Sequence, residues 1–310
     1  MSRTPEVVFD VTPHPTEGLD RQPTQTSTSE TLPPLPTDNS QPGKDSPVGH
    51  IVFTCFINGF DEICLMNADG SDQRRLTKVQ ATDFYASLAP DGSAIVFSSR
   101  RKDGFQIYSM DLDGNNVQRL SERIGSLFAP DISPDGELIV FANVRQGHQA
   151  IWVMNRDGSD AHSLTEGTWD DLDPVWSPDG RQISFASTRG GTRQLYVMDA
   201  DGSNVRKVTP DLPDMGGRND WSPDGKSLAF YAGPQLNHNI YLIDLDGTNL
   251  RQLTDGGDNL APSFSSDGQW VAFTSYRDGN NEIYIMRVDG SEIRRITSNT
   301  RADWQPRWGP

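Results

Sequence analysis

Short apolar runs, each closed by a polar turn, recur along most of this chain. Examples are Ile107-Tyr108-Ser109-Met110, Ile151-Trp152-Val153-Met154 and Leu195-Tyr196-Val197-Met198. Such runs are rich in β-branched and aromatic residues and are bounded by Gly, Asp, Asn or Pro, so they predict short β-strands. Because aromatic and Met residues return at the same place in each run, we interpret them as core packing between repeated units.

A turn signal repeats in step with these strands. Ser/Ala-Pro-Asp-Gly begins at residues 89, 133, 177 and 222, and Ser265-Ser266-Asp267-Gly268 follows, which gives a period of 43 to 45 residues. A second Asp-Gly pair recurs at residues 69, 113, 157, 201, 246 and 289. This period predicts the four-stranded blades of a β-propeller. Asp caps tight turns and Gly adopts positive φ in them, so we interpret both series as structural.

The two ends of the repeat predict how the ring closes. The first blade starts at its second strand, Ile51-Val52-Phe53, with no inner strand before it. Residues 303–310 match residues 171–178, which belong to an inner strand. We therefore expect an all-β, six-bladed propeller in which the C-terminal strand completes the first blade and leaves no long strand edge exposed.

Residues 1–48 differ in composition from the rest. They hold nine Pro, eight Thr and five Ser, with little apolar content. Such a segment cannot bury enough surface to order itself. We expect a disordered Pro/Thr/Ser-rich linker at 1–48 and a propeller at 49–310 with six blades of about 44 residues. A linker of this kind suits a tether, and it is compatible with a chain that is part of a longer protein.

The charge limits the expected partners. The formal charge is −16; residues 1–48 hold seven acidic and three basic residues, which leaves −12 for the remainder. Binding to nucleic acids or anionic membranes needs a basic footprint, so we expect neither. No run of 18 apolar residues predicts a membrane span, and the N-terminus lacks the apolar core of a secretion signal.

The two cysteines, Cys55 and Cys64, fall on adjacent predicted strands of the first blade. Whether they can pair depends on the strand register, which the sequence does not fix. Two cysteines make neither a disulfide framework nor a zinc site. We expect two buried thiols.

The candidate binding site lies on the face with the variable loops. Loops between second and third strands, and between blades, differ in length and chemistry, and such loops on a rigid scaffold commonly carry binding residues. Polar residues alternate along the inner strands, so we expect them to approach a central channel and make its mouth acidic. The channel then serves a cation or a basic peptide, or it holds water only. The selected residues are Asp83, Tyr85, Asp171, Asp173, Arg218, Asp220, Asn259 and Asp303.

Other candidates come from the loops and strand ends. Arginines recur four residues after the second-strand Phe, at Arg101, Arg145, Arg189 and Arg277. They fit a clamp for a carboxylate, and they fit structural ion pairs with acids of the blades, which we favour. Trp169 is either a binding anchor or a cover for a neighbouring loop. His238 falls on the predicted loop face.

Catalytic and metal-binding motifs are scarce. The sequence has no Gly-x-Ser-x-Gly elbow, no Walker-type loop, no HExxH and no CxxC. Clustered carboxylates could bind Ca²⁺ in the channel, but no loop has EF-hand spacing. We therefore expect no cofactor and favour a function without catalysis, although an acid pair of the glycosidase type stays open.

The repeat resembles a known family. Its segments are Pro-x-Trp-Ser-Pro-Asp-Gly, Ile-x-Phe-x-Ser, Ile-Tyr-Val-Met-Asp-x-Asp-Gly and Arg-x-Leu-Thr, which resemble the TolB-type propeller repeat, also called PD40 or WD40-like, over about residues 50–310. TolB itself has an α/β domain before the propeller, where this chain has the linker. The resemblance implies a protein-binding role in the bacterial cell envelope, hence a periplasmic or other extracytoplasmic location.

Three functional hypotheses follow. The first is a monomeric, non-enzymatic scaffold that binds a protein or peptide, including a basic one, at the loop face and channel mouth. The second is a propeller enzyme that acts on carbohydrate. The third is the sensor domain of a larger membrane receptor or kinase. The first agrees best with the missing catalytic motifs and with the resemblance.

Overall fold

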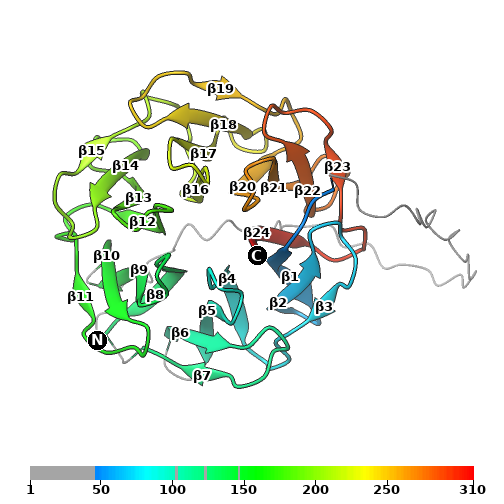
Figure 1. Cartoon of the computed structure of the whole chain (residues 1–310), viewed down its shortest axis with the longest axis horizontal. Helices are drawn as coiled ribbons and strands as arrows, with labels where there is room; N and C mark the ends of the chain where they lie inside the picture. Colours follow the sequence, from blue (N-terminus) through cyan, green and yellow to red (C-terminus); the bar gives the residue numbers. More distant parts are fainter. Residues whose placement is uncertain (1–45, 102–103, 122–123, 146) are drawn as a thin grey trace, which may run out of the picture. The chain divides into compact units, whose positions relative to one another are not determined.

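The computed structural model describes residues 46–101, 104–121, 124–145 and 147–310. In this part of the chain, Pro47–Pro310 form one unit in which six four-stranded antiparallel sheets are arranged around a common centre (Figure 1). The predicted six-bladed, all-β propeller is confirmed. Residues 1–45 of the predicted linker lie outside the described residues. Among the described residues, no helix has the length and hydropathy to cross a bilayer.

Each blade contributes one strand to each of four concentric positions. The strands nearest the centre are β24 (Asp303–Gly309), β4 (Thr82–Leu88), β8 (Ser126–Ile132), β12 (Asp171–Trp176), β16 (Asn219–Trp221) and β20 (Asn259–Phe264). The second strands are β1 (His50–Ile57), β5 (Ile95–Arg101), β9 (Leu138–Arg145), β13 (Gln182–Ser187), β17 (Ser227–Ala232) and β21 (Trp270–Ser275). The third strands are β2 (Phe60–Asn67), β6 (Gly104–Met110), β10 (His148–Asn155), β14 (Gln194–Asp199), β18 (Asn239–Asp244) and β22 (Glu282–Arg287). The outermost strands are β3 (Arg74–Arg75), β7 (Gln118–Arg119), β11 (His162–Ser163), β15 (Arg206–Lys207), β19 (Arg251–Gln252) and β23 (Arg294–Arg295).

The C-terminal strand closes the ring. Blade 1 is the sheet β24-β1-β2-β3, whereas blades 2 to 6 each take four consecutive strands from β4 onward. In blade 1, Ile51 pairs with Trp308 and Cys55 with Asp303 in antiparallel register. The predicted closure by residues near the C-terminus is therefore confirmed.

The hydrophobic core lies between neighbouring blades. Each second strand carries one Phe at the equivalent position, and all six are 0% exposed: Phe53, Phe97, Phe141, Phe185, Phe230 and Phe273. One cluster joins Val52 and Ile63 of blade 1 to Ile95 and Phe97 of blade 2. Burial of a Phe side chain contributes about 1.5–3 kcal/mol, so this packing between blades stabilises the ring.

The acids of the repeated turns bond to their own backbone. In blade 3, Ser133 donates a 2.6 Å hydrogen bond to Asp135, which also accepts one from the N–H of Glu137 at 3.1 Å. These two hydrogen bonds lower the pKa of Asp135 below its usual value. The structural interpretation of the turn acids is confirmed.

The Thr of the Arg-x-Leu-Thr segment forms hydrogen bonds to the third strand of its own blade. Thr297 accepts a 2.8 Å hydrogen bond from the N–H of Ile283 and donates one of 2.6 Å to Glu282. Equivalent hydroxyls accept hydrogen bonds from third strands: Thr77, Ser121, Thr165, Thr209 and Thr254. The hydroxyl therefore ties the segment that leaves the outermost strand to the third strand of its blade.

β-Bulges interrupt five of the six described inner strands. In blade 2, Phe84 pairs with Ser98 but Ser87 pairs with Val96, so β4 holds one extra residue. The extra positions have φ between 50° and 56°, in the left-handed region that non-Gly residues rarely adopt. They are Tyr85, Ala129, Asp173, Ala261 and Gln305. The expected simple alternation along the inner strands is wrong, because each bulge shifts the facing of the residues on either side.

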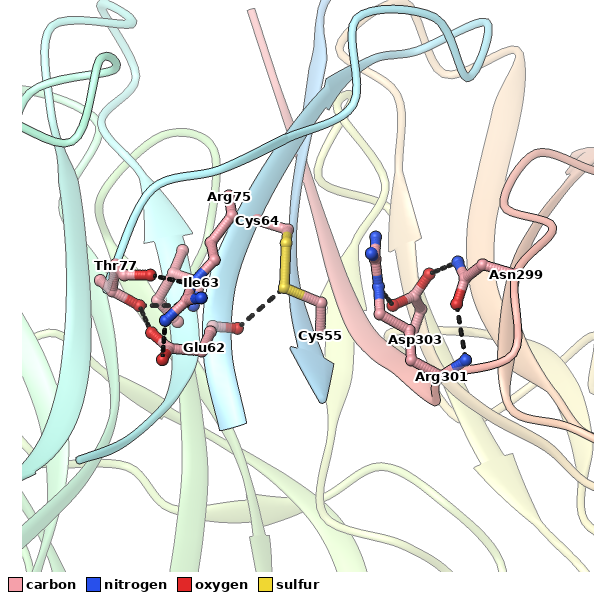
Figure 2. The surroundings of a disulfide bond; sticks show 9 residues. All are labelled: Cys55, Glu62, Ile63, Cys64, Arg75, Thr77, Asn299, Arg301 and Asp303. Atoms are coloured by element: carbon pink, nitrogen blue, oxygen red, sulfur yellow. Dashed lines mark hydrogen bonds and ion pairs between the residues drawn. A yellow bond between two sulfur atoms is a disulfide. The ribbon is translucent and has the colours of Figure 1, made fainter. Parts of the chain in front are cut away.

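Cys55 and Cys64 form a disulfide between β1 and β2 (Figure 2). Cys64 lies opposite Phe53 and Cys55 opposite Glu62, so the cysteines are diagonal neighbours on one face of the sheet. Their Cα atoms are 6.0 Å apart, a separation that a disulfide spans. The expectation of two buried thiols is wrong, since this register brings the two side chains together.

Candidate functional site

One face of the propeller carries the loops between second and third strands and the connections between blades; we call it the loop face. Four large apolar side chains of the described residues are exposed on it: Val79 at 42% before blade 2, Trp169 at 44% before blade 4, Leu236 at 76% in blade 5 and Tyr276 at 43% in blade 6. On the opposite face, the residue four positions after the Asp of the Asp-Gly turn is an exposed aliphatic side chain in four of the six blades: Val117, Val205, Leu250 and Ile293. The apolar residues of the loop face therefore differ from blade to blade, whereas those of the opposite face follow the repeat.

Arg189 illustrates what the recurrent arginines do. Its Nη2 donates to both carboxylate oxygens of Asp171, at 3.0 and 2.9 Å, and its Nε donates to Ser187 at 2.9 Å. Asp171 is 1% exposed. The guanidinium also lies 5.0 Å from the ring centre of Phe185 and 5.6 Å from that of Trp169. Arg189 thus satisfies a buried carboxylate, as a structural ion pair does.

The same arrangement returns with variations in other blades. Arg277 donates to Asn259 at 2.9 Å, and Arg301 bonds Asp303 at 3.0 Å. Arg101 donates to Ser99 at 3.0 Å and lies 4.3 Å from the centre of the Tyr108 ring. Arg145 lies 5.7 Å from the ring centre of Trp152. The second-strand arginines therefore contact groups of their own blade.

The acids and amides at the start of the inner strands are buried by this arrangement. Asp83, Asn259 and Asp303 are each 0% exposed, and Asp171 is nearly so. Burial raises the pKa of the Asp83 and Asp303 carboxyls. The expectation that these side chains form an acidic channel mouth is wrong, because they lie inside the packed structure.

A second group of charged residues meets at the centre of the ring. We call it the central cluster and define it as Tyr85, Asp131, Asp173, Arg218, Asp220 and Arg307. The members come from the inner strands of blades 1 to 5, and Arg218 directly precedes β16. Three carboxylates face two guanidinium groups, so the cluster is close to charge balance.

Two of the carboxylates link neighbouring blades. Asp131 accepts hydrogen bonds from the hydroxyl of Ser87 at 2.8 Å and from the N–H of Trp176 at 2.9 Å, and so connects blades 2, 3 and 4. Asp220 of blade 5 accepts from the hydroxyl of Ser263 in blade 6 at 2.8 Å. Arg307 of blade 1 lies 3.4 Å from Asp220. These contacts hold the inner strands in fixed relative positions.

Arg218, Tyr85 and Asp173 form the other part of the cluster. Arg218 is 5% exposed, and its guanidinium carbon lies 5.0 Å above the centre of the Tyr85 ring. Asp173 is also 5% exposed. A Cβ at Gly217 would lie 2.0 Å from Asp173 Oδ2, so only glycine permits this approach. Burial raises the pKa of Asp173, and Arg218 opposes that shift.

His238 lies apart from the central cluster, in the loop before β18. Its Nδ1 is 2.6 Å from Asp258 Oδ1, and its ring meets Tyr231 edge-on with centres 5.5 Å apart. The histidine therefore joins the loops of blades 5 and 6. This contact gives those loops a fixed shape at the loop face.

The sequence identifies the family to which this propeller belongs. Residues 120–219 and 210–310 each match the family described as PD40, TolB beta propeller domain. Together these two matches span more than half of the chain. The chain belongs to the TolB β-propeller family. The resemblance seen in the repeat is confirmed.

Solved structures share the fold of this TolB-type propeller. TolB from Acinetobacter baumannii is 24% identical with a TM-score of 0.77, over 84% of this chain and 67% of that one. Hydrazine synthase from Kuenenia stuttgartiensis is 17% identical with a TM-score of 0.72, over 84% of this chain and 46% of that one. Oligogalacturonate lyase from Vibrio parahaemolyticus is 15% identical with a TM-score of 0.55, over 80% and 74%. No curated protein sequence matches the chain. These likenesses show the fold alone, since propellers of different activities share it.

The predicted site residues of this TolB-type propeller separate into three groups. The central cluster brings together Tyr85, Asp173, Arg218 and Asp220. The packed blade structure holds Asp83, Arg101, Asp171, Arg189, Asn259, Arg277 and Asp303. The loop face carries Arg145, Trp169 and His238. Asp131 and Arg307 were not among the predicted site residues, although they hold the same repeat position as Asp220, directly before Ile132, Trp308 and Trp221 respectively.

Proposed function

We propose that this TolB-type propeller is a monomeric, non-enzymatic binding module that holds a protein or peptide at its loop face and central cluster. The observation that carries the proposal is the exposed set Trp169, Leu236 and Tyr276 on irregular loops of blades 4 to 6. Aromatic side chains dominate binding energy at many protein interfaces. The proposed function requires no cofactor.

Trp169 is suited to act as an anchor. Its ring lies against Arg189, which the buried Asp171 holds in place. A side chain that is already fixed loses little conformational freedom when a partner binds. We expect Trp169 to contribute about 2 kcal/mol or more to binding, as anchor residues do.

The charge of the propeller favours a partner with a basic surface. Residues 49–310 carry a formal charge of −12, and opposite charges accelerate encounter. The central cluster, with three carboxylates and two guanidinium groups, does not share this large excess of negative charge. We therefore expect the basic groups of the partner to contact the rim of the loop face.

An extracytoplasmic location fits the disulfide. Cys55 and Cys64 are bonded and nearly inaccessible, and structural disulfides persist mainly in oxidising compartments. In cell fractions, thiol labelling after denaturation should find both cysteines oxidised in the compartment where the protein acts. Free thiols in the native cellular pool would contradict this location.

The test is a differential pull-down from envelope and cytosolic extracts of the source organism. The baits are the full chain, the triple variant Trp169→Ala, Leu236→Ala, Tyr276→Ala and the control Val117→Ala, Val205→Ala, Ile293→Ala. Both variants remove exposed apolar side chains, but from opposite faces. We expect a partner that the native chain and the control retain and the loop-face variant loses. Equal retention by all three baits would refute the proposed surface.

A further inference from the structure

Arg218 and Arg307 are the two buried arginines of the described residues, at 5% and 6% exposure. The Arg218 side chain is buried at the centre of the ring, and its Nη2 has no hydrogen-bond partner among the described residues. In contrast, Arg189 and Arg277 direct the same nitrogen at Asp171 and Asn259. A guanidinium carries five donors, and a buried donor without an acceptor is destabilising. Arg218 therefore keeps an unpaired donor, whereas Arg307, the other buried arginine of the described residues, donates to the carbonyl of Asn219.

The neighbours of Arg218 hold it without occupying that donor. The guanidinium carbon lies 5.0 Å from the centre of the Tyr85 ring, and a cation–π contact of this kind does not provide a hydrogen-bond acceptor for Nη2. Burial and the nearby charge of Arg307 lower the pKa of Arg218 to about 10, so the group stays charged at neutral pH. Arg307 itself is engaged with the carbonyl of Asn219 and with Asp220.

The missing acceptor matches a carboxylate. A carboxylate and a guanidinium pair through two parallel hydrogen bonds, which satisfy an N–H edge in one contact. A single negative charge also suits a site that already holds Asp173 and Asp131, whose carboxylates would repel a more highly charged phosphate. An amide or a water molecule offers an acceptor but no charge.

We propose that Arg218 binds a carboxylate of the partner, presented by an acidic side chain that enters the centre of the ring from the loop face. This inference rests on the proposed function and names the chemistry that the centre of the ring recognises. Entry from the loop face follows from the chain path, because Arg218 directly follows the connection of residues 208–217 on that face. A narrow group is required, since Arg218 and Asp173 are each 5% exposed. A slender peptide side chain meets this requirement better than the ring of an acidic sugar.

The test uses the full chain and blocked pentapeptides, Ac-Gly-Gly-X-Gly-Gly-NH₂ with X as Glu, Gln or Lys, and digalacturonate as a non-peptide carboxylate. Affinities come from calorimetry, and arginine side-chain NMR reports on Arg218 directly. We expect the Glu peptide to bind at least tenfold more tightly than the Gln and Lys peptides. The Arg218 side-chain resonance should shift only with the Glu peptide.

Variants separate a recognition role from a structural one. Arg218→Gln should reduce the ratio of the affinities for the Glu and Gln peptides to about one, and Arg218→Lys should keep part of this preference. The control Arg206→Gln, on an exposed outer strand, should leave the ratio unchanged. If Arg218→Gln fails to fold, the affinity ratio of Arg218→Lys and the NMR shift of the Arg218 side chain in the native chain test the proposal instead. Equal affinities for the Glu and Gln peptides, no binding of the Glu peptide, or binding of digalacturonate alone would overturn the proposal. The proposed function would still stand if the pull-down separated loop-face and control variants.

Discussion

The closure of the ring by β24 predicts a large effect for one side chain, Trp308. It is 8% exposed and packs in a cluster that includes Ile51, Phe53 and Trp270 of blades 1 and 6. Its indole N–H donates a 2.8 Å hydrogen bond to the carbonyl of Val48. The substitution Trp308→Ala removes both contacts while leaving the backbone of β24 able to pair with β1.

The size of the effect follows from these contacts. Truncation of a buried Trp to Ala destabilises by about 3–5 kcal/mol, and a lost hydrogen bond adds about 1 kcal/mol. Whole domains are stable by about 5–15 kcal/mol, so this one change removes a large share. At roughly 2–4 °C for each kcal/mol in domains of this size class, we expect the melting temperature to fall by about 10–20 °C.

Trp304 of the same strand provides the matched control. It is only half-buried, so Trp304→Ala should destabilise by clearly less than Trp308→Ala. The measurement is urea unfolding followed by Trp fluorescence, with thermal melts beside it. Deletion of residues 301–310 should go further and abolish a single cooperative transition. A loss below 1 kcal/mol for Trp308→Ala, or equal losses for both tryptophans, would refute closure as a source of stability.

Three further predictions test individual contacts of the structure. Arg189→Gln should destabilise the fold by about 3 kcal/mol in urea unfolding, because it leaves the buried Asp171 carboxylate without its ion-pair partner. Adding Asp171→Asn should restore more than half of the lost stability, whereas unchanged stability in Arg189→Gln would instead support a ligand clamp. The double variant Cys55→Ser, Cys64→Ser should lose about 2–3 kcal/mol relative to the oxidised chain, and dithiothreitol should affect only the parent. Burial raises the pKa of the Asp83 carboxyl above 3.8, so ionisation of Asp83 destabilises the fold as pH rises through the raised pKa. Asp83→Asn should therefore stabilise the chain at pH 7, and this gain in stability should vanish as pH falls toward 3.8. A gain that stays constant with pH would contradict a raised pKa for Asp83.

The repeat made the fold predictable from the sequence. Each blade reuses one set of turn acids, strand apolar residues and a second-strand Phe, so every copy supports the same assignment. The closure was predictable for the same reason, since residues 303–310 match an inner strand without a blade of their own. Repetition therefore supplied evidence that a single copy could not.

The details of the inner strands and the disulfide could not be predicted in this way. A bulge adds one residue without a distinct sequence signal, and Tyr85, Ala129 and Gln305 adopt positive φ although none is glycine. The disulfide depends on a diagonal register between β1 and β2. In both cases the decisive quantity is the pairing of backbone atoms on adjacent strands, which the pattern of apolar and polar residues specifies only approximately.

Departures from the repeat point to the candidate site more directly than the repeat itself. In blade 5, Gly216-Gly217-Arg218-Asn219 replaces the segment that ends in Pro or Ala in the other blades, and the inner strand β16 begins only at Asn219 without a bulge. Both glycines are required by close approaches, since a Cβ at Gly216 would lie 1.7 Å from Tyr231 Cζ. A repeat unit that needed only to pack would gain nothing from this change. The change does bring Arg218 against Tyr85 at the centre of the ring with a free donor, so we assign specificity to the irregular blade and stability to the regular ones.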